Sequence, residues 1–194
     1  MRKILVTYAT NSGSTVNVAQ AVASELEQSG AVVDVEPTRK VDSLDGYDMV
    51  ILGAPMIFGW HADARRFLRR YKTELASKKT ACFACAMRLT EVPNEDLPDV
   101  PLFLDKNLAS APEKSGSLSL KERFTTVRHY IKPIMGTASG VKPMSVAFFG
   151  GKLDMTRLKW WQALFVMAVV QAAPGDFRDW ESIKAWARAL SRDL

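Results

Sequence analysis

The first residues with side chains suited to binding a ligand form a loop of small and hydroxylated residues near the N-terminus. An apolar run from Lys3 to Tyr8 precedes it, and a segment of helical periodicity follows it. The loop consists of Thr10, Asn11, Ser12, Gly13, Ser14 and Thr15. A strand, a polar loop and a helix N-terminus make an anion site, because the first N–H groups of a helix are unpaired.

This loop contains no Lys or Arg, and it lacks both the Gly-Lys-Ser/Thr of nucleoside-triphosphate loops and the three-glycine dinucleotide fingerprint. A phosphate held only by hydroxyl and amide groups suits a tightly bound cofactor monophosphate. The alternative is a Ser/Thr-rich turn that merely caps a helix.

A second loop offers aromatic rings and follows the apolar run 49–53. It consists of Pro55, Met56, Ile57, Phe58, Gly59 and Trp60. Phe58 and Trp60 could stack on a flat heterocycle. A third loop, Ala86, Met87 and Arg88, follows another apolar run and would add a wall to the same site. His61 either bonds the ligand or begins the next helix in a structural role.

The elements that must position these loops alternate along the chain. Apolar, β-branched runs predict strands at 3–8, 31–35, 49–53, 80–87 and 144–149. Helical spacing predicts helices from 16, over 62–77 and over 121–132 with a stop at Pro133, and a last helix capped by Asp179. This alternation predicts an α/β fold with a doubly wound parallel sheet and helices on both faces.

Composition limits the class of protein. With 194 residues and 47% hydrophobic residues, we expect a single globular domain over 1–194. A net charge of +5 favours an anionic partner, but no recognition motif supports nucleic acid. Since no secretory signal or run of about 20 apolar residues occurs, we expect a cytoplasmic protein. Cys82 and Cys85 should face opposite sides of a strand, buried and inert, with no metal site.

Two segments depart from a simple alternating pattern. The first, 91–119, is rich in proline and predicts an insertion that is either functional, as a lid over the active site, or disordered. Its apolar trio 102–104 indicates that part of it docks on the domain. The second is a C-terminal helical extension over 152–194. Within it, 157–170 begins with Arg157, Lys159, Trp160 and Trp161 and is then apolar on almost every face. It is either a core helix or a peripheral contact with the membrane surface.

The loop from Thr10 to Thr15, placed between strand and helix, resembles the FMN-phosphate loop of the flavodoxin-like family. The resemblance covers roughly 1–90 and 143–150. It implies a five-stranded parallel sheet of order 2-1-3-4-5, with FMN bound by the three loops. Flavodoxin is itself one of the folds from which the rule that ligands bind at the switch in strand order was drawn.

A narrower resemblance rests on the tail. Gly151-x-Leu153-Asp154 before a basic and apolar segment, and Asp179-Trp180-Glu181 opening the last helix, are similar to the menaquinone-dependent protoporphyrinogen oxidases of bacterial haem synthesis. This implies an FMN-dependent oxidoreductase that passes electrons from a flat anionic porphyrinogen to a quinone, peripheral on the inner face of the cell membrane. Carboxylates of such a substrate could meet the arginines near the loops, which otherwise form a solvated face: Arg65, Arg66, Arg69, Arg70 and Arg88.

Two alternatives stay open from the sequence. One is an electron-transfer flavodoxin that serves a redox partner protein, which the positive charge and the apolar C-terminal segment disfavour. The other is an FMN-dependent NAD(P)H:quinone reductase. Oxidation of a reduced nicotinamide would favour this second alternative.

Overall fold

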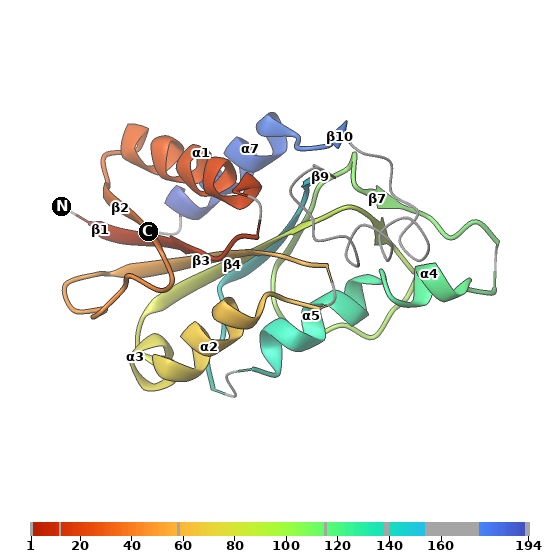
Figure 1. The fold of residues 1–194 in the computed structure, drawn as a ribbon, viewed down its shortest axis with the longest axis horizontal. Coiled ribbons are helices and arrows are strands. Elements are labelled where there is room, and N and C mark those ends of the chain that lie inside the picture. The colour runs from red at the N-terminus through yellow and green to blue at the C-terminus, as the bar shows by residue number, and fades with distance from the viewer. Residues whose placement is uncertain are drawn as a thin grey trace.

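A six-stranded parallel sheet forms the centre of the protein (Figure 1). The computed structural model describes residues 2–11, 13–57, 59–114, 116–137, 140–153 and 175–192. The strand order is β2-β1-β3-β4-β8-β6. The bounds are β1 Lys3–Tyr8, β2 Val32–Pro37, β3 Met49–Pro55, β4 Lys79–Ala86, β8 Ser145–Gly150 and β6 Leu102–Leu104.

Helices cover both faces of this sheet (Figure 1). On one face lie α1 (Ser14–Gln28) and α7 (Trp180–Arg192); on the other lie α2 (Ala62–Arg70), α3 (Lys72–Ala76) and α5 (Val127–Met135). Side chains alternate between the two cores along each strand, so Ile51 packs on the α1 side and Leu52 on the α2 side. The predicted doubly wound α/β fold is confirmed, including the order of its first five strands.

Close packing at the centre requires a glycine in β3. A β-carbon at Gly53 would lie 1.9 Å from Cζ of Phe83 on β4, the neighbouring strand. Phe83 is completely buried and contacts the ring of Trp186 on α7 edge-on, with 6.0 Å between centroids. The absence of a side chain at Gly53 thus leaves room for the ring that joins the sheet to α7.

The sixth strand corrects the prediction of five. It is β6, which comes from the 91–119 insertion and pairs in parallel with β8, with Leu102 opposite Val146 and Leu104 opposite Phe148. The predicted docking of the apolar trio is therefore confirmed, although the trio docks as a strand. A three-residue strand is too short to show periodicity in the sequence, and it forms because β8 would otherwise expose its edge.

The helix predicted over 62–77 is interrupted at Tyr71, which separates α2 from α3. The Tyr71 hydroxyl donates a 2.7 Å hydrogen bond to the carbonyl oxygen of Val41, and the ring is 4% exposed. A tertiary contact with a distant loop thus accompanies the break, and periodicity could not have shown it.

The helix predicted over 121–132 is also split, into α4 (Leu120–Arg123) and α5, and it does not stop at Pro133. Thr126 begins α5 by accepting a 3.0 Å hydrogen bond from the His129 N–H. Pro133 lies in the last turn of α5, so its missing N–H removes a single hydrogen bond close to the end of the helix.

The last helix begins as predicted. Asp179 caps α7, since its Oδ1 accepts hydrogen bonds from the N–H groups of Glu181 and Ser182. Ile183 and Trp186 of α7 are buried against the sheet, whereas Trp180 is 38% exposed. It lies instead against the guanidinium of Arg178, 4.6 Å from the ring centroid.

The remaining strands form two small sheets outside the central one. β9 (Lys152–Leu153) pairs antiparallel with β10 (Gly175–Asp176), and β5 (Leu89–Thr90) pairs in parallel with β7 (Ala109–Ser110). None of the helices within the described ranges is long and apolar enough to cross a bilayer. The predicted 157–170 segment lies outside the described residues.

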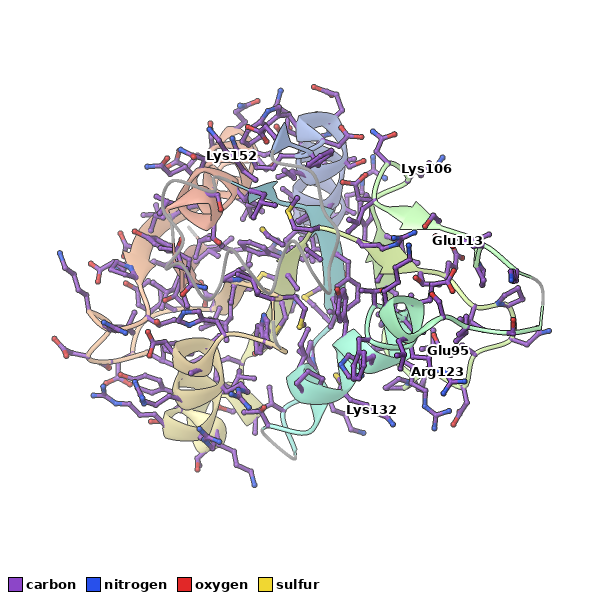
Figure 2. The ribbon with its side chains drawn as sticks, turned by 45° about the vertical axis from the view of Figure 1, so that its right-hand side comes forward. Glu95, Lys106, Glu113, Arg123, Lys132 and Lys152 are labelled. Atoms are coloured by element: carbon purple, nitrogen blue, oxygen red, sulfur yellow. The ribbon has the colours of Figure 1, made fainter. Side chains whose placement is uncertain are left out.

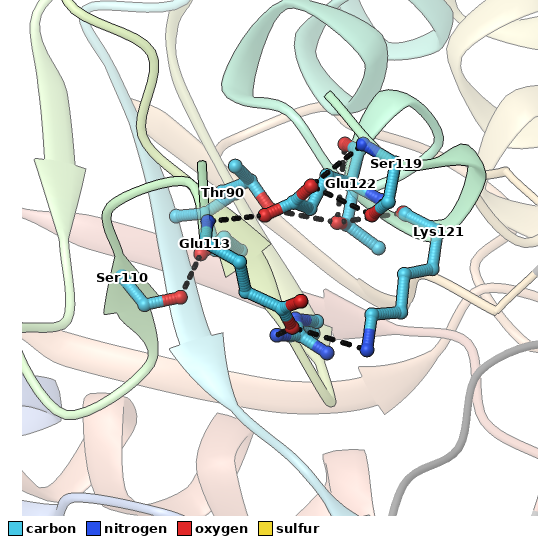
Figure 3. A network of polar contacts seen from close by, with 9 residues as sticks. Thr90, Ser110, Glu113, Ser119, Lys121 and Glu122 are labelled. Atoms are coloured by element: carbon cyan, nitrogen blue, oxygen red, sulfur yellow. Dashed lines mark hydrogen bonds and ion pairs between the residues drawn. The ribbon is translucent and has the colours of Figure 1, made fainter. Parts of the chain in front are cut away.

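A buried carboxylate organises the insertion around α4 (Figure 3). Glu122 is 2% exposed and accepts hydrogen bonds from the N–H of Glu113, the N–H of Ser119 and the Ser119 hydroxyl, at 2.6–2.7 Å. The Glu113 carboxylate in turn pairs with Arg88 and Lys121. Figure 2 shows the charged side chains of Glu95, Glu113 and Arg123 around this outer part of the molecule.

The Glu122 network makes the insertion sensitive to acid. Hydrogen bonds from Ser119 and Glu113 lower the pKa of Glu122 from 4.5 to about 2. Because the pKa is lower in the folded state, Glu122 stabilises the fold fully above pH 4.5, and this contribution is lost as the pH falls towards 2. We expect Glu122→Gln to lower the free energy of unfolding at pH 7 and to flatten its fall in acid, measured by urea unfolding at a series of pH values.

Glu113→Gln is the matched control, since its carboxylate belongs to the same network but is 55% exposed. We expect that variant to lose less than about 1 kcal/mol at pH 7. An acid profile of Glu122→Gln that coincides with that of the unmodified protein would contradict the role of Glu122.

Candidate functional site

Three loops meet where the parallel strands β1, β3 and β4 end. Parallel strands carry their carboxyl ends at one edge of the sheet, and here the strand order reverses between β1 and β3. In open α/β sheets, ligands bind at such a point. The three loops predicted to bind a cofactor therefore follow neighbouring strands.

The first loop ends in an α1 N-terminus that no side chain caps. Gly13 occupies the cap position with φ of 89°, a left-handed conformation that favours glycine, and its N–H donates a 2.8 Å hydrogen bond to Oγ1 of Thr10. Ser12 lies outside the described residues. The N-terminal dipole and amide groups of α1 are thus available to an anion.

Unpartnered polar atoms gather at these segments. Among the described residues, buried side-chain oxygen or nitrogen atoms without a hydrogen-bond partner are Oγ1 of Thr7, Oγ1 of Thr15 and Nε1 of Trp60. All three belong to β1 or to the segments that follow β1 and β3. Buried polar atoms are normally paired, so the Thr15 hydroxyl, which lies at the start of α1, indicates a site that a ligand completes.

His61 joins the first two loops. Its Nε2 lies 2.9 Å from Oδ1 of Asn11, and its Nδ1 accepts a 3.2 Å hydrogen bond from the Asp63 N–H at the start of α2. An accepting Nδ1 places the ring proton on Nε2, which then donates to Asn11. Burial lowers the pKa of His61, against the opposing effect of Asp63, so the imidazole is neutral at pH 7. His61 therefore has the structural role that the sequence left open, since it caps the start of α2.

The second loop turns back on itself. Met56 and Trp60 form an isolated β-bridge, and Gly59 has φ of 92°. Trp60 is 2% exposed and packs in the core on the α2 side of the sheet, so its ring is not open to solvent for stacking. Phe58 lies outside the described residues. Trp60 thus supports the loop from within the core.

The third loop is tied to the insertion and to the chain after β8. The carbonyl oxygen of Ala86 accepts a 2.7 Å hydrogen bond from the Gly151 N–H. Nη2 of Arg88 lies 3.2 Å from Oε1 of Glu113, so this arginine pairs within the protein. Met87 is half-buried beside Gly151.

The arginines of α2 form an exposed face. Arg65, Arg66, Arg69 and Arg70 are all exposed. Arg66 pairs with Asp63, and Arg70 lies over the ring of Tyr71. These contacts fit the solvated face that the sequence left as an alternative to carboxylate recognition.

The two cysteines are buried on opposite sides of β4, as predicted. Cys82 belongs to the core on the α2 side and Cys85 to the core on the α1 side. Burial raises the pKa of each thiol to about 12. The Thr15 hydroxyl would stabilise a thiolate at Cys85, but makes no hydrogen bond with the neutral thiol. No group of metal ligands occurs within the described part of the chain.

Sequence reasoning missed Arg178, which lies in the segment between β10 and α7. Nη1 of Arg178 lies 3.1 Å from Oδ1 of Asn17 and 3.4 Å from the carbonyl oxygen of Ser14, both in the first turns of α1. The Arg178 side chain is 7% exposed. More than 160 residues separate it from its partners, so no spacing in the sequence signals the contact.

Comparison with known proteins agrees with this geometry. The family model described as a flavodoxin domain matches residues 5–179. The chain belongs to the flavodoxin domain family. Protoporphyrinogen IX dehydrogenase (quinone) of Escherichia coli strain K12 is 22% identical over 200 residues, which cover 97% of this chain and 94% of the relative.

Solved structures show the same fold. Oxidised flavodoxin 2 from Bacillus cereus aligns over 99% of both chains with a TM-score of 0.51 and 16% identity. A flavodoxin from the domain Archaea aligns over 98% of this chain and 97% of its own, with a TM-score of 0.50 and 12% identity. At these identities the likeness concerns the fold.

Membership of this family implies FMN as the cofactor, and the residues at the site fit its phosphate. The uncapped α1 N-terminus offers amide groups, and the buried Thr15 hydroxyl has no protein partner. Both are hydrogen-bond donors suited to phosphate oxygens.

Removal of the unpartnered Thr15 hydroxyl should stabilise the cofactor-free protein and weaken its binding of FMN. Thr15→Val replaces a buried, unpaired hydroxyl by a methyl group, so the cofactor-free protein should gain about 1 kcal/mol of unfolding free energy. The same change should weaken FMN binding about tenfold, because a charge-assisted hydrogen bond is lost. Thermal unfolding and fluorescence titration with FMN measure the two effects.

Thr7→Val is the matched control, since its hydroxyl is also buried and unpartnered but lies within β1. It should stabilise the cofactor-free protein and leave FMN affinity unchanged. Equal FMN affinity for Thr15→Val and Thr7→Val would remove Thr15 from the phosphate site.

Proposed function

We propose that this protein is an FMN-dependent oxidoreductase that transfers electrons from a flat anionic substrate of the porphyrinogen class to a quinone. The observation that carries the proposal is the match with protoporphyrinogen IX dehydrogenase (quinone), which extends over nearly the full length of both chains. A match of that extent includes the segments beyond the cofactor loops, where a substrate would be recognised.

The cofactor loops have distinct parts in this proposal. Residues of the first loop hold the phosphate: Thr10, Asn11, Ser12, Gly13, Ser14 and Thr15. Residues of the second and third loops border the ring: Pro55, Met56, Ile57, Phe58, Gly59, Ala86, Met87 and Arg88. The flavin supplies the redox chemistry, so the protein has to bind, orient and tune it. Trp60 acts from the core and His61 by linking the loops.

Charge supports an anionic substrate. The chain carries a net charge of +5, whereas docking to basic redox partners would favour an acidic surface. Arg65 and Arg69 are exposed on α2, which begins directly after the second loop. Their guanidinium groups suit the paired carboxylates of such a substrate.

The decisive experiment is anaerobic. FMN-loaded protein is mixed with protoporphyrinogen, and the absorbance of oxidised flavin is followed. We expect bleaching on addition of the substrate and its recovery on addition of a menaquinone analogue. FMN in the same buffer without protein is the control for direct reaction.

The absence of bleaching in protein that holds FMN would contradict the substrate assignment. Bleaching by a reduced nicotinamide instead would identify a quinone reductase. Neither outcome would affect the fold or the phosphate site.

We also propose a peripheral membrane contact through 157–170, supported by the sequence alone because these residues lie outside the described part. Arg157, Lys159, Trp160 and Trp161 combine positive charge with indole rings, which favour the interface of an anionic bilayer. The double variant Trp160→Ser and Trp161→Ser should sediment less with anionic liposomes than the unmodified protein. Equal co-sedimentation of the two proteins would contradict the membrane contact and would favour a core helix over 157–170.

A further inference from the structure

Arg178 occupies a position that its local sequence does not explain. Its Nε lies 2.7 Å from Oδ1 of Asp176, and its Nη2 pairs with Oδ2 of the same carboxylate. Its Nη1 faces Oδ1 of Asn17 and the carbonyl oxygen of Ser14. These contacts use four of the five N–H donors of a guanidinium and fix the plane of the group against the first turns of α1.

The backbone that carries Arg178 is fixed as well. The N–H of the preceding Phe177 donates a 3.0 Å hydrogen bond to the carbonyl oxygen of Gly151. The next residue, Asp179, accepts a 2.7 Å hydrogen bond from Nδ2 of Asn107 in the insertion. A β-carbon at Gly150 would lie 1.8 Å from the carbonyl oxygen of Phe177, so the segment passes directly over the end of β8.

Arg178 contacts the start of the helix that follows a loop without basic residues. The stretch from Thr10 to Thr15 contains no Lys or Arg, although the α1 N-terminus and the unpartnered Thr15 hydroxyl are suited to an anion. Arg178 is also close enough to Cys85, at the end of β4, for its charge to lower the pKa of that thiol against the raising effect of burial. Cys85 and Thr15 are neighbours in the same region.

We propose that Arg178 is a positioning residue of the FMN-phosphate site. It holds the first turns of α1, through the Ser14 carbonyl oxygen and the Asn17 side chain, so that the amide groups and the Thr15 hydroxyl converge on the phosphate. The proposal rests on the proposed binding of FMN and deepens it by giving the C-terminal segment a part in phosphate recognition.

A purely structural role predicts a different result, and the chain offers a control for it. Nη1 of Arg188 on α7 lies 3.1 Å from Oε1 of Glu25 on α1, so this pair joins α1 to the helix that follows Arg178. Glu25 lies in the last turns of α1, far along the helix from the phosphate loop. Loss of helix packing alone would affect variants at Arg178 and Arg188 alike.

The experiment compares two ligands that differ only in the phosphate. Affinities for FMN and riboflavin are measured by fluorescence titration at one ionic strength for the unmodified protein, Arg178→Gln, Arg178→Lys and Arg188→Gln. We expect Arg178→Gln to weaken FMN binding about tenfold and to leave riboflavin binding unchanged, since the loss concerns the phosphate. Arg178→Lys should keep part of the preference for FMN, and Arg188→Gln should keep all of it.

An equal loss for FMN and riboflavin in both Arg178 variants would overturn the proposal, and so would an unchanged preference for FMN in Arg178→Gln. If the unmodified protein bound FMN no better than riboflavin, the result would contradict the phosphate site itself. A failure of the porphyrinogen assay leaves this titration interpretable, because the titration requires binding and no turnover. Circular dichroism confirms that each variant is folded.

Discussion

The parallel pairing of β1 with β3 is the constraint on which the rest of the structure depends. It brings Ile4 opposite Met49 and Tyr8 opposite Gly53, so both strands end at the same edge and their loops become neighbours. Both strands are buried between two layers of helices, which fixes their register, because a shift by one residue would exchange the two cores. The hydrogen bond between His61 and Asn11 can form only in this arrangement.

Buried or paired polar groups hold the insertion and the C-terminal segment against the rest of the protein. The insertion is organised by the Glu122 carboxylate and extends the sheet through β6. The completely buried Asp105 follows β6 and accepts a 3.1 Å hydrogen bond from the Gly150 N–H at the end of β8. Asn107 then reaches Asp179 at the start of α7. The insertion and the C-terminal segment are therefore connected to each other and to the sheet edge that carries the site.

This arrangement separates the tasks of the protein. The uncapped α1 N-terminus and the Thr15 hydroxyl suit a phosphate group. The neighbouring loop is held by the buried ring of Trp60 and by the neutral imidazole of His61. The exposed arginines lie on α2, outside the cofactor loops. Binding of a cofactor and recognition of an anionic partner can thus depend on different residues of one sheet edge.

The sequence by itself determined the alternation of strands and helices, the hydroxyl-rich loop, the burial of the cysteines on opposite faces and the Asp179 cap, because these features depend on periodicity or on neighbours in the chain. Only the tertiary structure decided the sixth strand, the break at Tyr71, the burial of Trp60, the Glu113 partner of Arg88 and the contact of Arg178 with α1. Each of these joins segments distant in sequence. Such contacts form because buried edges, hydroxyls and charges must find partners in the folded chain, and local patterns do not show which partner lies nearby.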